Sequence, residues 1–236
     1  MFLSAISFRT LRMVLGLIGV ALITTGCFDI EEEVTLNQDG SGTYLQRIDM
    51  SGFMAMLEGF GGDETTGTEM FDSMDSSMQV TANNMRDLPG ISNVASRSEG
   101  YVFSVSCDFA EIDALNRAIK QNQSSTEGAA DSPLAGLNSG DGANYLLKGK
   151  TFIRKDAPID ARMDEMEEEE KQQLQMAKMM MSDASYKLIY HLPGEVKRMT
   201  NEAATLSADS RTVTLDLSFV DLLEGRGNIG NEIEFK

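Results

Sequence analysis

The stretch FDIEEEVTLNQDGSGTYLQRIDM, residues 28–50, decides the fold class. Apolar and polar residues alternate over positions 28–36, which is the pattern of a half-buried strand. Glu32 is the exception, because it falls on the apolar face of that strand. The polar residues 37–42 (NQDGSG) predict a turn and residues 43–50 predict the returning strand. The segment is therefore expected to form a β-hairpin.

Further strands follow the same alternating pattern. The clearest runs over residues 101–109, where Cys107 shares the apolar face with Phe103 and Val105, so we expect its thiol in the core. It forms a hairpin with residues 91–97. The remaining predicted strands are residues 145–154, 186–192, 203–207, 212–219 and 229–235.

Helical spacing of apolar residues appears between the hairpins. A flexible glycine-rich stretch at 61–67 is expected between the helical residues 53–60 and a helix over 70–86. Further helices are predicted over 111–120 and 159–181. The elements together predict an α+β fold, with a mostly antiparallel sheet built from hairpins and Met-rich helices packed on one face. We expect a single domain over residues 27–236, with a mobile loop at 121–143 that is rich in Gly, Ser, Asn and Asp.

Residues 1–26 have the three parts of an export signal. Arg9 and Arg12 supply positive charge, and an apolar run follows over residues 13–23. About eleven apolar residues suit a signal peptide and fall short of the roughly 20 that a membrane-spanning helix needs. Small residues then lead directly to Cys27.

The sequence ALITTGC, residues 21–27, resembles the lipobox of bacterial lipoproteins. Thr24 departs from the pattern, which has leucine at that place. The resemblance implies cleavage before Cys27, a diacylglyceryl cysteine with palmitate-type chains, and a lipid anchor in the membrane. An ordinary signal peptide with an incidental cysteine, or an uncleaved anchor, is the alternative.

Such an anchor would place the chain outside the cytoplasm of a bacterium. The outer face of the inner membrane, the outer membrane and the cell surface remain alternatives. Asp29 and residues 31–33 resemble the acidic surface-export signals of Bacteroidota lipoproteins, although the exposed face of the first strand would explain them equally.

Charge excludes one class of partner. Removal of residues 1–26 would take away two arginines and no acidic residue, so the net charge would change from −17 to −19. Such a chain repels nucleic acid and anionic surfaces. An acidic run at 164–170 is explained by a solvated helix face, and Lys148, Lys150 and Arg154 are expected to meet that helix or lipid head groups.

Candidate catalytic residues are few. His191 is the single histidine and is expected to face solvent, and no nucleophile or acid beside it in the sequence suggests a triad. The chain has too few His and Cys residues for an ordinary zinc site, and no glycine-rich segment fits a nucleotide fingerprint. We therefore expect no catalytic residues, no metal and no cofactor, with a hydrolase kept as a minor alternative.

The methionines are the least ordinary feature of the composition, because the chain has 16 of them. Flexible thioether side chains suit adaptable apolar surfaces. The sequence therefore suggests an apolar ligand site under the Met-rich helices, with these candidate residues: Met70, Met74, Met78, Met176 and Met180. A gap-filled core, or a face for protein contacts in an assembly factor, are the alternatives.

A second resemblance covers the later segment. Residues 186–196 (YKLIYHLPGEV), Asn201 and the strand from Thr212 are similar to the LppM-type domain of bacterial lipoproteins, and the DGSG turn at 39–42 agrees. The resemblance implies an α+β domain facing the envelope, able to bind lipid and without catalytic residues. The sequence thus predicts a non-enzymatic, lipid-anchored protein of the cell envelope that binds a ligand or partner at the membrane surface.

Overall fold

The computed structural model describes residues 28–59, 64–124, 144–156, 175, 178–179 and 181–236. The predicted signal peptide, Cys27, the acidic run at 164–170 and most of the helix expected over 159–181 lie outside the described residues.

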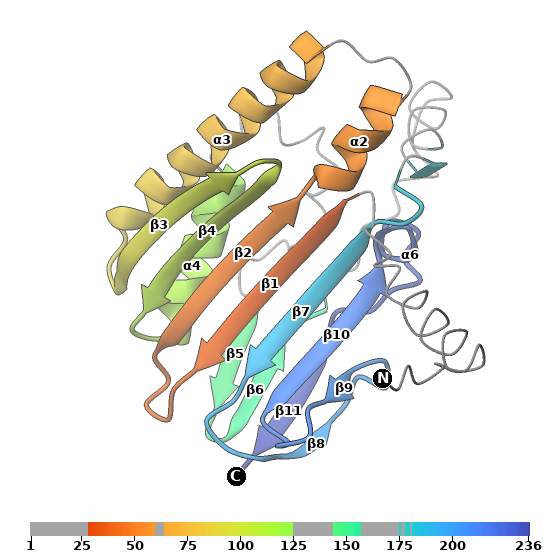
Figure 1. Cartoon of the computed structure of the whole chain (residues 1–236). Coiled ribbons are helices and arrows are strands. Elements are labelled where there is room, and N and C mark those ends of the chain that lie inside the picture. The colour runs from red at the N-terminus through yellow and green to blue at the C-terminus, as the bar shows by residue number, and fades with distance from the viewer. Residues whose placement is uncertain (1–27, 60–63, 125–143, 157–174, 176–177, 180) are drawn as a thin grey trace, which may run out of the picture.

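A seven-stranded sheet forms the larger layer (Figure 1). Its order is β3-β4-β2-β1-β7-β10-β9, so β1 is the central strand. β1 pairs in parallel with β7, and every other pairing in this sheet is antiparallel. Its strands are β1 (Asp29–Leu36), β2 (Gly42–Asp49), β3 (Ile91–Glu99), β4 (Val102–Phe109), β7 (Ser185–His191), β9 (Thr205–Leu206) and β10 (Thr212–Ser218).

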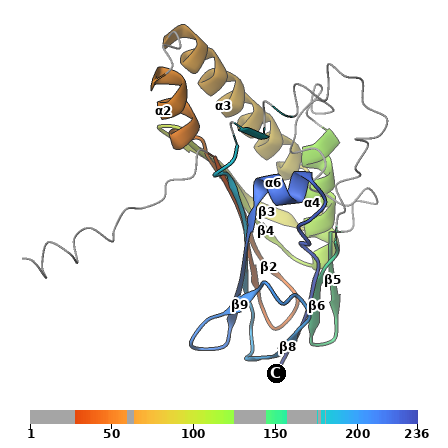
Figure 2. The same ribbon diagram turned by 90° about the vertical axis from the view of Figure 1, so that its right-hand side faces the viewer.

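A second, four-stranded antiparallel sheet packs against one face of the large sheet (Figure 2). Its order is β5-β6-β11-β8, with β5 (Tyr145–Lys148), β6 (Thr151–Arg154), β8 (Val196–Met199) and β11 (Asn231–Phe235). The prediction of a single strand over residues 145–154 is wrong, because these residues form a hairpin of β5 and β6. Gly149, at φ 59°, makes the turn, because glycine adopts positive φ without steric cost.

The helices α2 (Ser51–Gly59), α3 (Glu64–Arg86), α4 (Ile112–Ser124) and α6 (Phe219–Leu223) complete the described chain. α3 and α4 cover β3 and β4 on the face that also carries the second sheet, and none of the described helices or strands covers the opposite face of the large sheet (Figures 1 and 2). Met78, Ala82 and Met85 of α3 are buried in the core. The predicted α+β fold, with a mostly antiparallel sheet and a Met-containing helix on one face, is confirmed.

Two predicted boundaries are wrong. α3 begins at Glu64, inside the glycine-rich stretch, and α4 continues to Ser124, so residues 121–124 are helical rather than part of the predicted loop. Glutamine is a good helix former, which is why the polar composition of residues 121–123 does not end the helix. None of the helices in the described ranges is long and apolar enough to cross a membrane.

Candidate functional site

A charged side chain lies at the centre of the core. Glu32 is in the middle of β1 and shares the inner face with Ile30 and Val34, and the residue is only 2% exposed. It is thus the polar residue that interrupts the alternation of the first strand. Burying a carboxylate is costly unless partners compensate for its lost hydration.

The partners of Glu32 come from both sheets. The Tyr186 hydroxyl, on the neighbouring strand β7, donates to Oε2 at 2.6 Å, and the Tyr145 hydroxyl, on β5, donates to Oε1. Nη2 of Arg154 lies 4.0 Å from Oε2, and the guanidinium carbon lies 4.9 Å from the centroid of the Tyr145 ring. We call Glu32, Tyr145, Arg154, Tyr186 and Tyr190 the buried polar centre.

Strand register brings this centre together. Tyr145 and Asn231 both occupy positions that pair with Arg154, so the three residues are neighbours across β5, β6 and β11. The amide of Asn116, on α4, holds Tyr145 in place by accepting from its N–H at 2.9 Å and donating to its C=O at 2.8 Å. The prediction that Arg154 meets an acidic helix or lipid head groups is wrong, because β6 turns its side chain inward and leaves it 0% exposed.

Electrostatics in the centre follow from this burial. Burial alone would lower the pKa of Arg154, but the charge interactions with Tyr145 and Glu32 raise it well above its ordinary value, so the guanidinium stays charged. Burial, together with the charge of Glu32, raises the pKa of the four core tyrosines, which are Tyr44, Tyr145, Tyr186 and Tyr190.

The buried polar centre is closed to ligands. Nε, Nη1 and Nη2 of Arg154 and the hydroxyl of Tyr190 are buried, and no group in the described part of the chain forms a hydrogen bond with them. These atoms are almost fully shielded from bulk solvent. The arrangement can fix how the two sheets face each other, and it offers no surface for a substrate.

His191 has two polar neighbours on the open face of the large sheet. Its Nε2 lies 3.0 Å from Oε1 of Glu33 on β1, and its Nδ1 lies 3.0 Å from Oγ1 of Thr212 on β10. An acid, an imidazole and a hydroxyl are the components of a catalytic triad. The His191 side chain is 39% exposed on a face that no described helix covers, so nothing in the described part excludes water from it (Figure 1).

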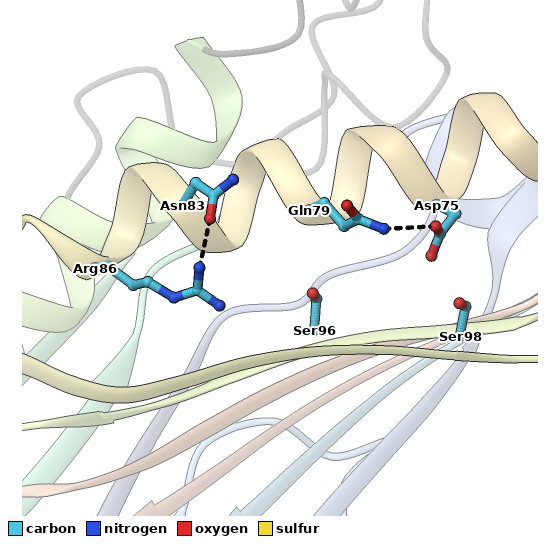
Figure 3. Close-up of a pocket in the computed structure, with 6 residues that line it drawn as sticks. All are labelled: Asp75, Gln79, Asn83, Arg86, Ser96 and Ser98. Carbon is cyan, nitrogen blue, oxygen red and sulfur yellow. Dashed lines mark hydrogen bonds between the residues drawn. The ribbon is translucent and has the colours of Figure 1, made fainter.

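A polar groove runs between α3 and the edge strand β3 (Figure 3). It has a volume of about 250 Å³ and is lined by Asp75, Gln79, Asn83, Arg86, Ser96 and Ser98. Gln79 donates to Asp75 at 2.7 Å, and Arg86 donates to Asn83 at 2.5 Å. Carboxylate, amide, guanidinium and hydroxyl groups therefore line the groove, and the four side chains from α3 are paired with one another.

Sequence reasoning missed this groove, although a signal was present. Residues 75, 79, 83 and 86 follow one stripe of α3 at helical spacing, and residues 96 and 98 share one face of β3. A polar stripe on a helix is usually a solvated face. Only the packing of α3 along β3 turns the two stripes toward each other.

The methionines predicted to bind an apolar ligand are only partly described. Met78 is buried in the core and Met74 is partly buried against it. The side chain of Met70 lies outside the described residues, as do Met176 and Met180. The apolar ligand site stays a prediction.

Two further predictions concern Cys107 and a metal site. The Cys107 thiol is free and buried, as predicted. Burial raises its pKa to about 12 from the ordinary 9.0. Over the described ranges, no group of three His, Cys, Asp or Glu side chains could hold a metal ion.

The start of β1 is fixed in the domain. Phe28 is 8% exposed and packs edge-on against Phe219, with 6.1 Å between ring centroids. The backbone N–H of Ser185 donates to the carbonyl oxygen of Phe28 at 3.0 Å. The residue that follows Cys27 in the chain is therefore already part of the core.

No protein-family model and no curated protein matches the sequence. Among solved structures, the NMR structure of the folded domain of the Mycobacterium tuberculosis LppM protein is similar to this chain. The similarity covers 89% of this chain and 90% of that chain, with 11% sequence identity and a TM-score of 0.43. That protein is of the type that residues 186–196 resemble.

Proposed function

We propose that this chain is a non-enzymatic bacterial lipoprotein, anchored by lipid on Cys27, whose α+β domain binds a ligand or partner at the membrane surface of the cell envelope. The basic residues, the short apolar run and the small residues before Cys27 support export and lipidation. Two acyl chains on one cysteine would give stable attachment, whereas one chain binds only marginally.

The observation that carries the proposal is the distance between the lipobox-like motif and the folded domain. Phe28 is buried and β1 begins at Asp29, so the domain starts immediately after Cys27. A cysteine that carries no lipid has no reason to lie directly before the first buried residue of the domain. A lipid on this cysteine would hold the domain against the bilayer. A ligand or partner would then meet the domain at the membrane surface.

The non-enzymatic part of the proposal is supported by the surroundings of the polar groups. The buried polar centre has no access to substrate, and His191 lies on an open sheet face where water competes for every hydrogen bond. Transition-state stabilisation in acyl transfer needs donors preorganised in a site that excludes water. The polar groove between α3 and β3 is instead suited to binding.

Lipidation is tested by replacing the anchor residue. In bacteria that express the full chain, Cys27→Ser should abolish incorporation of a palmitate analogue and release the protein from the membrane fraction. Cys107→Ser is the matched control, because it also removes a thiol and should leave the label unchanged. Equal labelling of Cys27→Ser and the unaltered chain would refute the anchor.

Binding is tested by native mass spectrometry of the mature protein released from detergent. A co-purified small molecule supports a ligand-binding role, and its loss in Arg86→Ala would assign it to the polar groove. A stable dimer without ligand would favour an assembly factor instead. A hydrolytic activity that His191→Ala abolishes would overturn the non-enzymatic proposal.

A further inference from the structure

One end of the large sheet collects the segments closest to Cys27. β1 and β7 are parallel and both begin there, with Asp29 paired to Ser185. β2 ends there as well, because Asp49 pairs with Asp29, and the chain continues directly into α2. We call this end of the sheet the anchor end.

α2 extends the molecule beyond the anchor end. In Figures 1 and 2 it stands past the ends of β1 and β2. Its nine residues correspond to a length of about 13 Å. Covalent geometry keeps Cys27 within about 7 Å of Asp29, since two extended residues span no more than that. A lipid on Cys27 would therefore hold this end of the sheet near the bilayer, on the side where α2 stands (Figures 1 and 2).

The composition of α2 suits that environment. Its sequence, SGFMAMLEG, contains four large apolar side chains and a single charged residue, Glu58. Met54 is buried, and Phe53 packs partly against the core. Met56 and Leu57 are partly exposed and do not belong to that core. They are the apolar side chains that remain for another surface.

Two acidic residues of the anchor end have partners within the protein. Asp29 accepts a hydrogen bond from the Ser185 hydroxyl at 2.7 Å, and Asp49 forms an ion pair with Arg47 at 2.9 Å. The guanidinium of Arg47 offsets the charge of Asp49, whereas the neutral hydroxyl of Ser185 leaves the charge of Asp29 in place.

We propose that α2 is a second membrane contact, which inserts Met56 and Leu57 into the head-group region of the bilayer that holds the Cys27 lipid. This inference rests on the proposed lipid anchor. Apolar faces of interfacial helices bury about 5–10 Å into the boundary between head groups and acyl chains. Two contacts, the lipid and α2, fix the orientation of the domain, whereas a lipid alone would let it rotate.

Tryptophan fluorescence tests this contact without interference, because the chain contains no Trp. Leu57→Trp introduces a single probe on α2, with Met56→Trp as a second position in case the first variant does not fold. Leu206→Trp is the matched control, since Leu206 is 39% exposed on β9, at the opposite end of the sheet. Each lipidated full-length protein is reconstituted in phosphatidylcholine vesicles, with or without bromine on the acyl chains.

We expect bromine to lower the emission of the Leu57→Trp or Met56→Trp protein at least roughly twofold, as for a residue at the acyl boundary. The emission of the Leu206→Trp protein should not change. Equal emission in both vesicle types at both α2 positions, in protein whose mass shows the diacylglyceryl group, would overturn the α2 contact and leave the anchor intact. Protein without that mass would instead overturn the proposed anchor, and with it the proposed orientation of the domain.

Discussion

Replacement of Glu32 by glutamine tests whether the buried polar centre stabilises the fold. The Glu32 side chain is 3% exposed and that of Arg154 is 0% exposed, with 4.0 Å between Oε2 and Nη2. Glutamine keeps the size of the side chain, so no cavity forms. The variant removes the counter-charge of a guanidinium whose Nε, Nη1 and Nη2 have no hydrogen-bond partner among the described residues.

The expected loss is large on the scale of protein stability. Removing one member of a buried ion pair lowers the free energy of unfolding by about 3–5 kcal/mol, because the remaining charge is left uncompensated. The total free energy of unfolding of a protein domain is about 5–15 kcal/mol. With a urea dependence of about 2–3 kcal/mol per molar, the unfolding midpoint should fall by about 1–2.5 M.

The assay is urea unfolding followed by far-UV circular dichroism, in a Cys27→Ser background that avoids detergent. Glu31→Gln is the control, since it makes the same chemical change on the opposite face of the same strand. It should change the free energy of unfolding by less than about 0.5 kcal/mol, as for most surface substitutions. Equal midpoints for the two variants would refute the reasoning.

A double replacement separates the charge interaction from packing. Arg154→Met alone should also destabilise, because it leaves Glu32 without its cation. Glu32→Leu combined with Arg154→Met removes both charges, and pairs replaced in this way are often neutral or stabilising. The hydroxyls of Tyr145 and Tyr186 lose their acceptor, which costs about 1–3 kcal/mol each. We therefore expect the double variant to lose less than the sum of Glu32→Leu and Arg154→Met, and additive losses would contradict a coupled pair.

Three further predictions concern the core. Burial raises the pKa of the four core tyrosines above the ordinary 10.0, so their contribution to stability is complete below about pH 10 and is lost as the pH rises toward the folded-state values. Absorbance of tyrosinate should therefore appear together with loss of circular dichroism, and ionisation of these tyrosines in a folded protein near pH 10 would contradict it. A pKa of about 12 leaves Cys107 with about 10³-fold less thiolate at pH 8 than a thiol of pKa 9.0, so a thiol reagent should modify it only after denaturation. Fast labelling of the native Cys27→Ser protein would show that the thiol is accessible. Gly42→Ala should lower the melting temperature by several degrees, because the added Cβ would overlap the Thr35 carbonyl oxygen and lie 2.5 Å from Cζ of Phe109. Gly59→Ala is its control, since a Cβ there meets nothing within 4 Å, and equal melting temperatures would contradict the steric argument.

Local patterns in the sequence were sufficient for most strands. The hairpins at 28–50 and 91–109 follow from alternation and turn residues, because both act between neighbours in the chain. The same alternation marked Glu32 as a polar residue on an apolar face, and it placed Cys107 in the core. Alternation failed over residues 145–154, where a glycine turn at Gly149 divides the segment into β5 and β6.

The sequence by itself determined which side of each strand is apolar, the α+β class and the export-like segment before Cys27. Only the tertiary structure decided which strands pair, because the parallel pairing of Asp29 with Ser185 joins residues far apart in the chain. It also decided that Arg154 of the second sheet faces Glu32 of the first, and that α3 lies along β3 to form the polar groove. Periodicity assigns a residue to a face, but the partner of that face is selected by burial and charge compensation over the whole core.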